Sequence, residues 1–484
     1  MSSIWITDNH KPIQLDAVPN ERYCHNITDK EQTISDINEI ANKELNSISL
    51  KDNPNLLIFP RDLYQYGDNI GESHIISLKD DKISTGNIMG FVGLNQTQID
   101  IKSRFANFDN EDYFLHYMLQ KVFSINLFDI KHTTNQEQIF DFLLYLFPHF
   151  LKKALAQGLF KKYKRHEYND ANVRGPIDVN RHIRQNIPFK GTVAYTIREH
   201  SYDNEVTQLV RHTIEYIRTK EQGSAILNND LETKTCVSQI IMATQTYNLR
   251  DRNKIINQNL RPVRHPYYSD YTELQKICLQ ILRHESLKYG QEKDKIYGIL
   301  FDGAWLWEEY LNTIFEKNNL EITHAKNKTK ETGIQIYKGS CNYYPDFYKR
   351  EKGDEMGEKS FVFDAKYKRL GYDVKTDGQD DLSLNKISIC HDDLFQMITY
   401  MHTLPAKHCA LLYPIEPNEL NEQDKNNSAK VIVSKKRELY GFGGEIFGYG
   451  IKVSSQNDKN LFWEEMQCLE EDFCKKINKF REEI

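Results

Sequence analysis

Asp346, Asp364 and Lys366 are the candidate chemical groups of residues 344–368, which read YPDFYKREKGDEMGEKSFVFDAKYK. Asp346 follows a proline at the start of one expected strand, and Asp364 lies at the end of the next. Two strands joined by a polar loop form a hairpin, which can bring both carboxylates to one edge of a sheet. Asp364 and Lys366 are two positions apart, so their side chains point to the same face. The pattern predicts a site of two carboxylates and one ammonium group.

Hydrolysis of a phosphodiester is the chemistry that this set of residues suits. Mg²⁺ is a hard cation that is held by a few carboxylates and keeps positions open for water and phosphate. Asp346 and Asp364 would be ligands, and the carbonyl oxygen of Ala365 would add another. Lys366 would orient or deprotonate the attacking water and offset the charge of the phosphate. The alternative is that Asp364 and Lys366 form a structural ion pair.

The elements around this segment have the mixed pattern of an α/β domain, which we assign to residues 291–484. The spacing of apolar residues predicts helices over 303–315 and 392–403, a strand over 360–368 and an apolar strand over 408–413. Four polar residues on these helices are candidates for the site: Glu308 and Glu309 on the first helix, and Gln396 and Tyr400 on the second.

The rest of the chain predicts two further domains, so the expected fold is a multidomain α+β fold. Residues 1–108 are β-rich, with short alternating runs and one expected helix. Residues 109–290 mostly follow the helical period and form a helical middle domain. Pro148 interrupts an expected apolar helix at 139–159 and predicts a kink or two helices. We expect the basic residues at 161–166 to be the tail of this helix, and a strand at 193–198.

Composition narrows the class of protein. The chain has 484 residues and a net charge of −6, and no apolar run reaches the ~18 residues of a membrane helix. With no signal peptide in view, we expect a cytoplasmic protein that does not contact membranes. The eight cysteines form no CxxC pair, so core thiols are expected rather than a metal site. Residues 152–198 contain eleven Lys or Arg against three Asp or Glu, which suits either phosphate contact or a solvated face.

The ordered set of residues around the two aspartates resembles the PD-(D/E)XK nuclease motif. Pro345-Asp346 and Asp364-Ala365-Lys366 correspond to the motif, and the residues from Gln396 to Tyr400 resemble the QxxxY helix of its DNA-processing members. That superfamily often has a glutamate near the metal on the preceding helix. We favour Glu308 over Glu309 because Glu308 follows an aromatic residue. The resemblance implies Asp346, Asp364 and Glu308 as metal ligands, and Lys366 and Gln396 as further catalytic groups. The implied cofactor is Mg²⁺, with Mn²⁺ as the alternative ion.

A wider resemblance covers residues 85–415. GFVGLNQTQIDIKSRF at 90–105 and the segments at 150–178 and 195–217 are similar to the N-terminal and middle regions of McrC-type restriction subunits, which include the LlaJI-type proteins. The family pattern has a proline before the lysine in the first of these segments. This chain instead reads Ile101-Lys102-Ser103-Arg104.

The McrC-like pattern implies a Mg²⁺-dependent endonuclease of an anti-phage restriction system. Such a subunit cuts double-stranded DNA together with a separate McrB-like AAA+ GTPase. No GxxxxGK[ST] motif occurs here, so we expect no nucleotide to bind this chain itself. Residues 1–108 would dock on the partner. The alternatives are a RecB-like repair nuclease and a non-catalytic activator or adaptor of an NTPase. Cleavage that requires methylcytosine, as in McrBC, and cleavage of an unmodified site, as in LlaJI-type systems, both agree with the sequence.

Overall fold

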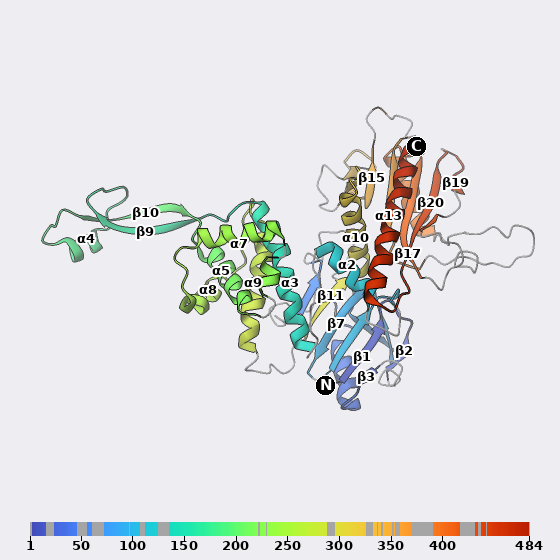
Figure 1. Ribbon diagram of the computed structural model, residues 1–484, viewed down its shortest axis with the longest axis horizontal. Helices are drawn as coiled ribbons and strands as arrows, with labels where there is room; N and C mark the ends of the chain where they lie inside the picture. The colour runs from blue at the N-terminus through green and yellow to red at the C-terminus, as the bar shows by residue number, and fades with distance from the viewer. Residues whose placement is uncertain are drawn as a thin grey trace, which may run out of the picture. The chain divides into compact units, whose positions relative to one another are not determined.

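Two segments that are far apart in the sequence, Met1–Ser124 and Lys293–Ile484, form one compact unit, and Ile125–Glu292 forms a second. In Figure 1 the second unit carries the green colours of the middle of the chain. The computed structural model describes residues 2–15, 24–45, 56–60, 72–95, 97–106, 112–123, 135–220, 223–228, 230–287, 296–325, 333–335, 337–339, 342–350, 353, 359–369, 391–416, 431–433, 437–441 and 443–483.

The first unit contains a six-stranded sheet that is built mainly from the N-terminal segment. Its strands lie in the order β3 (Cys24–Asn26), β1 (Ser2–Thr7), β8 (Thr97–Lys102), β7 (Ile88–Leu94), β11 (Tyr297–Asp302) and β4 (Leu56–Phe59). Helix α1 (Lys30–Ile40) packs Ile37 and Ile40 into the apolar core of this sheet. A smaller sheet joins β2 (Ile13–Gln14), β6 (Lys82–Thr85) and β5 (Ile76–Lys79).

Strand β11 comes from the range that we expected to form the C-terminal domain, yet it lies inside the N-terminal sheet. It pairs with β7 in antiparallel orientation and with β4 in parallel orientation. Gly90 and Gly298 make this approach close, because a Cβ on Gly90 would lie 2.1 Å from the carbonyl oxygen of Ile299. The N-terminal sheet is therefore complete only with a strand from beyond residue 290.

A second, seven-stranded sheet of the first unit comes entirely from the C-terminal segment. Its order is β12 (Thr323–His324), β15 (Phe347–Lys349), β16 (Phe361–Ala365), β17 (His408–Ile415), β20 (Glu445–Lys452) and β18 (Val431–Val433), and β19 (Arg437–Glu438) also pairs with β20. Strands β15 and β16 are antiparallel with Phe347 opposite Phe363, whereas β16, β17 and β20 run parallel. A separate pair joins β13 (Ile334–Gln335) and β14 (Asn342–Tyr343).

Helices cover both faces of this sheet, as the alternation along β16 requires. On one face, Val362 packs in a core with Met397 and Met401 of α11 (His391–Thr403). On the other face, Phe361 and Phe363 contact Phe480 of α13 (Lys459–Glu483). The further helices of this unit are α10 (Gly303–Lys317) and α2 (Tyr113–Phe123). Helix α2 packs against α10 and α13, although we expected residues 109–290 to form the middle domain.

The second unit is a helical body. Its helices are α3 (Asn135–Ala156), α5 (Glu205–Arg218), α6 (Gly223–Leu227), α7 (Leu231–Ala243), α8 (Arg252–Gln258) and α9 (Tyr271–Leu287), with the short 3-10 helix η4 (Leu249–Asp251). Helix α3 continues through Pro148 instead of forming two helices there. Helices α3 and α5 both pack against α9, which places the apolar face of α9 in the centre of the body.

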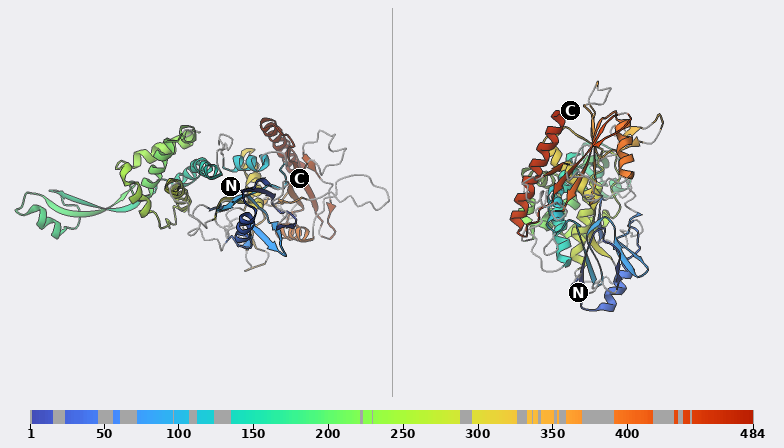
Figure 2. Two further views of the ribbon diagram at one scale, coloured as in Figure 1. Left: turned by 90° about the horizontal axis from the view of Figure 1, so that it is seen from below. Right: turned by 90° about the vertical axis from the view of Figure 1, so that its right-hand side faces the viewer.

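A long β-hairpin projects from this helical body, as Figures 1 and 2 show. Strands β9 (Lys162–Asp170) and β10 (Val193–Ser201) are antiparallel over their full length, and α4 (Val179–Asn186) lies between them in sequence. The basic residues that we expected as a helical tail are therefore part of a strand. The helix ends earlier, because Gly158 adopts a positive φ of 89° and turns the chain away.

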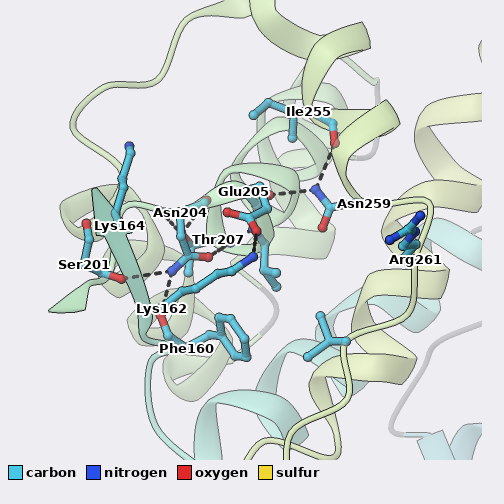
Figure 3. Close-up of polar contacts among 12 residues, drawn as sticks. Phe160, Lys162, Lys164, Ser201, Asn204, Glu205, Thr207, Ile255, Asn259 and Arg261 are labelled. Atoms are coloured by element: carbon cyan, nitrogen blue, oxygen red, sulfur yellow. Dashed lines mark hydrogen bonds and ion pairs between the residues drawn. The ribbon is translucent and has the colours of Figure 1, made fainter. Parts of the chain in front are cut away.

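Asn204 joins the two ends of the hairpin to the helical body (Figure 3). Its side-chain oxygen accepts hydrogen bonds from the first backbone N–H groups of α5, at Val206 and Thr207. Its amide nitrogen donates to the carbonyl oxygens of Phe160 and Ser201, at 3.0 and 3.1 Å. This one buried side chain therefore caps α5 and also bonds to a residue just before β9 and to the last residue of β10.

Candidate active site

Asp346 lies directly before β15, and its position is fixed by the neighbouring strand. The backbone N–H of Ala365 donates a 2.7 Å hydrogen bond to Oδ2 of Asp346. The carbonyl oxygen of Asp346 accepts a hydrogen bond from Ala325, next to β12. The expected hairpin is present, because β15 and β16 pair directly. It brings Asp346 beside the end of β16, where Asp364 and Lys366 lie.

Asp364 is the next-to-last residue of β16 and is 1% exposed. It lies between β15 and β17, opposite Leu411 of β17. Its Oδ2 is 2.6 Å from Nζ of Lys366, so the buried carboxylate forms an ion pair with the ammonium group. This pairing offsets part of the cost of burying both charges.

Lys366 follows the end of β16 and connects the strand to α11. Its backbone N–H continues the parallel ladder by donating to the carbonyl oxygen of Leu412. Its Nζ donates a 2.9 Å hydrogen bond to Oε1 of Gln396. Gln396 in turn donates from Nε2 to the hydroxyl of Tyr400, at 3.1 Å. Gln396 and Tyr400 are one helical turn apart, so both lie on the face of α11 that contacts the strand.

Glu308 is the glutamate of α10 that lies near the aspartates. Its negative charge is one cause of the raised pKa of Asp346. Oε1 of Glu308 is 2.6 Å from Nε2 of His324, whose ring stacks on Phe347 at 4.9 Å between centroids. Glu309, by contrast, is 4% exposed and packs into the interior of the unit.

The charges of this site are unevenly balanced. Burial raises the pKa of Asp346 well above its ordinary value, and the charges of Glu308 and Asp364 raise it further. Burial also raises the pKa of Asp364, against the opposing effect of Lys366. Burial lowers the pKa of Lys366, but the charge and hydrogen bonding of Asp364, together with the charges of Asp346 and Asp393, outweigh that effect, and the pKa is raised. More positive charge near the two aspartates would therefore stabilise their ionised forms.

A hard divalent cation such as Mg²⁺ is the ion that carboxylates of this kind would hold. Among the residues that the structure describes, no group of three or more His, Cys, Asp or Glu side chains is placed to hold a metal ion. Mg²⁺ does not need such a group, because one or two protein carboxylates are completed by water and phosphate oxygens. Asp346 and Asp364 supply two carboxylates from adjacent strands, and Glu308 is the nearby third.

Two charged residues of the site were not among those we selected from the sequence. Asp393 is 6% exposed, and its carboxylate contacts both Lys368 and Lys366, the latter at 3.6 Å. It lies three residues before Gln396 on α11, and this spacing is the signal in the sequence that could have identified it. His324, the partner of Glu308, lies in a two-residue strand with no such signal.

No helix in the described part of the chain has the length and apolar character needed to cross a membrane.

Comparisons with known proteins add four findings. A family model described as "McrBC 5-methylcytosine restriction system component" matches residues 83–414, which is more than half of the chain. A structure titled "Refined half-complex from tetradecameric assembly of Thermococcus gammatolerans McrB AAA+ hexamers with bound McrC" is 13% identical with a TM-score of 0.46, and the match covers 99% of this chain and 100% of that one. The cryo-EM structure of the McrBC complex from the same organism is 13% identical with a TM-score of 0.32, covering 67% and 90%. No curated protein matches the sequence.

Proposed function

This chain belongs to the family of McrBC 5-methylcytosine restriction system components, and from that premise we propose that it is the nuclease subunit of such a system. The family match confirms the resemblance identified over residues 85–415. The proposed reaction is Mg²⁺-dependent hydrolysis of phosphodiester bonds in double-stranded DNA. The proposed site consists of Asp346, Asp364 and Lys366, with Glu308 and Gln396 beside them.

One observation carries the proposal. Asp346, Asp364 and Lys366 come from one hairpin and lie together where β15 begins and β16 ends. Lys366 contacts both Asp364 of β16 and Gln396 of α11, so its ammonium group is held between a strand and a helix. The order of elements from α10 through β12, β15, β16 and α11 to β17 supports a PD-(D/E)XK fold. A non-catalytic adaptor would have no need for two adjacent carboxylates whose pKa values burial raises.

Each residue has a proposed role. Asp346 and Asp364 would hold Mg²⁺, with Glu308 as the additional acid. The bound ion would supply positive charge to stabilise the transition state at the phosphate. Nζ of Lys366 would orient the attacking water and offset negative charge on the phosphate. Gln396 accepts a hydrogen bond from that Nζ and would hold it in position.

We further propose that cutting requires a separate McrB-like AAA+ GTPase. The family is one component of a multi-component system, and the sequence has no GxxxxGK[ST] motif of its own. Docking of the partner on residues 1–108 and a cytoplasmic location remain parts of this proposal. One site cuts one strand, so a double-strand break would need two copies of the site or two successive cuts.

A cleavage assay tests this function. The chain is purified with an McrB-like AAA+ GTPase and incubated with methylated and unmethylated plasmid DNA. We expect breaks only when the partner, GTP and Mg²⁺ are all present, and none in EDTA or with Asp364→Asn. Rapid, specific cleavage by the chain alone without nucleotide would contradict the partner requirement. Cleavage that persists in EDTA would contradict the metal site.

A further inference from the structure

Arg104 is a buried cation in the first unit and the last residue of the segment Ile101-Lys102-Ser103-Arg104, which departs from the family pattern. It is 5% exposed, and its Nε donates a 2.9 Å hydrogen bond to Oδ2 of Asp8, which is 1% exposed. Its Nη2 also donates to Oδ1 of Asn87, at 2.5 Å. Arg104 thus joins β1, β7 and β8 of the N-terminal sheet through side chains that follow or precede those strands.

Tyr367 connects this cluster to the candidate active site, because it directly follows Lys366. Its ring lies below the guanidinium of Arg104, which is 5.0 Å from the ring centroid. Its hydroxyl is 2.7 Å from Oγ of Ser103 and 3.1 Å from Sδ of Met89. Tyr367 is 4% exposed, so the chain after Lys366 enters the N-terminal part of the unit instead of solvent.

The same cluster also fixes the start of α10, the helix that carries Glu308. A Cβ on Gly303 would lie 2.7 Å from Cε1 of Tyr367, so the ring packs directly on the backbone there. The N–H of Gly303 donates to the carbonyl oxygen of Asn87, whose side chain contacts Arg104. The cluster therefore touches both elements that supply groups to the site, the end of β16 and the start of α10.

A second contact strengthens the connection. Nη2 of Arg369 donates a 2.6 Å hydrogen bond to the backbone carbonyl oxygen of Arg104. Residues 367 and 369, on either side of Lys368, are thereby both attached to residues 103–104. Lys366 has a fixed backbone on one side through β17 and on the other through this cluster.

We propose that Arg104 is a positioning residue of the candidate active site. Through Tyr367 it holds Lys366 and Glu308 in their positions relative to each other. This inference rests on the proposed nuclease function. Arg104 makes no described contact with Asp346 or Asp364, the proposed metal ligands. Its proposed role is to fix the positions of other residues. A displacement of about 1 Å can reduce a reaction rate ~10²-fold, so a cluster that joins both elements has leverage on the rate.

A buried ion pair alone would be weak evidence for this role. Burying Arg104 and Asp8 costs desolvation energy, and apolar residues of similar volume often stabilise a protein as well or better. The arginine also has a specific geometry that lysine cannot reproduce, since its planar fork binds Asp8 and Asn87 while its face covers Tyr367. This combination of contacts favours a role in geometry over a role in stability alone.

Two variants of the full chain, each assayed with the AAA+ partner, test the inference. Arg104→Lys keeps the charge but loses the fork and the planar face, and Tyr367→Leu loses the ring that lies against Arg104 and Gly303. The control is Asp36→Asn, which weakens another buried polar cluster of the N-terminal sheet, where Asp36 accepts hydrogen bonds from Asn95 and Thr97.

We expect single-turnover cleavage at saturating Mg²⁺ to slow about 10-fold or more in Arg104→Lys. The DNA concentration for half-maximal rate should stay the same. Asp36→Asn should cut at the wild-type rate per folded molecule, even if its melting temperature falls as far. Equal rates in Arg104→Lys and Asp36→Asn would overturn the inference. If Arg104→Lys does not fold, the rate of Tyr367→Leu is compared with that of Asp36→Asn in the same way, and equal rates overturn the inference.

Hydrogen exchange separates a failure of this inference from a failure of the proposed function. If the wild-type complex does not cut DNA, the nuclease proposal is wrong, but exchange can still be measured. Faster exchange of the amides of Ala365 and Lys366 in Arg104→Lys, and not in Asp36→Asn, would support the positioning role. Unchanged exchange in both variants would overturn it.

Discussion

Nζ of Lys366 lies 2.6 Å from Oδ2 of Asp364, two residues earlier in the chain, and 2.9 Å from Oε1 of Gln396 on another element. The first contact follows from the alternation of a strand, since residues two apart share a face. The second contact depends on how α11 packs against β16. Together they fix the ammonium group between a strand and a helix. The carboxylate of Asp346 is the second acidic group beside it.

Asp364→Asn should abolish cleavage while the protein stays folded. The amide has nearly the same shape as the carboxylate, but it is a weak ligand for Mg²⁺. Folding should survive because burial already disfavours the charge of Asp364, and Lys366 keeps its contacts with Gln396 and Asp393. Cleavage assays beside thermal melts and partner-binding measurements check this. Near-wild-type cutting by the folded variant would remove Asp364 from the site.

Lys366→Ala should slow the chemical step by ~10²-fold or more, the scale of a positioned proton donor or electrostatic group. Metal affinity should stay similar or tighten slightly, because an ammonium group near two carboxylates opposes a cation. Single-turnover cleavage and calorimetry with Mg²⁺ measure the two effects separately.

Lys368→Ala is the matched control for this variant. Lys368 also pairs with Asp393 but is more exposed and makes no described contact with Asp364. We expect cleavage close to wild type in this control. If Lys366→Ala instead lowers stability while activity per folded molecule stays normal, the ion pair with Asp364 is structural and the catalytic assignment is wrong.

The sequence predicted the parts of the site that depend on local periodicity. The hairpin that joins Asp346 to Asp364 and the shared face of Asp364 and Lys366 both follow from the period of a strand, and the structure contains them. Asp393 and His324 were missed because their roles depend on contacts between elements. Nothing in the two residues around His324 indicates that it would meet Glu308.

The fold was predictable to a similar extent. The strands and helices near the site matched the apolar spacing, but the pairing of β11 with β7 did not follow from it, because periodicity identifies a strand and not its neighbours. The basic residues in β9 also lacked a strand signal. This strand is largely exposed and is held by its pairing with β10, so its sequence has no apolar face to reveal it.

Asn204→Ala should destabilise the second unit by about 1–2 kcal/mol, the scale of a lost helix cap. The variant also leaves the carbonyl oxygens of Phe160 and Ser201 without their donor, which adds to the cost. Denaturant unfolding of the full chain measures the change, and hydrogen exchange in α5 locates it. Asn248→Ala is the control: this exposed cap of a short 3-10 helix should contribute only a few tenths of a kcal/mol. Equal losses in the two variants would contradict the role of Asn204 at the base of the hairpin.

His212 should make the second unit less stable as the pH falls. It is 1% exposed, its ring lies 4.7 Å from that of Tyr247 at a tilt of 57°, and neither ring nitrogen has a hydrogen-bond partner among the described residues. Burial, followed by the charges of Arg252 and Arg211, lowers the pKa of His212 to about 4. In the unfolded chain the pKa is near its ordinary value of about 6.5. The unfolded state therefore binds more protons between these values, and the stability present above pH ~6.5 is lost as the pH falls towards ~4.

The measurement compares wild type with His212→Phe, which keeps an aromatic ring of similar size but cannot be protonated. The free energy of unfolding is determined for both near pH 7 and near pH ~4.5. Relative to the variant, wild type should lose roughly 2 kcal/mol over this range, since each pKa unit corresponds to about 1.4 kcal/mol. Other titrating groups cancel in the comparison, including Asp112, whose pKa burial raises to about 6 and whose contribution has the opposite sign. A difference between the two proteins that stays constant with pH would show that His212 titrates alike in the folded and unfolded chain.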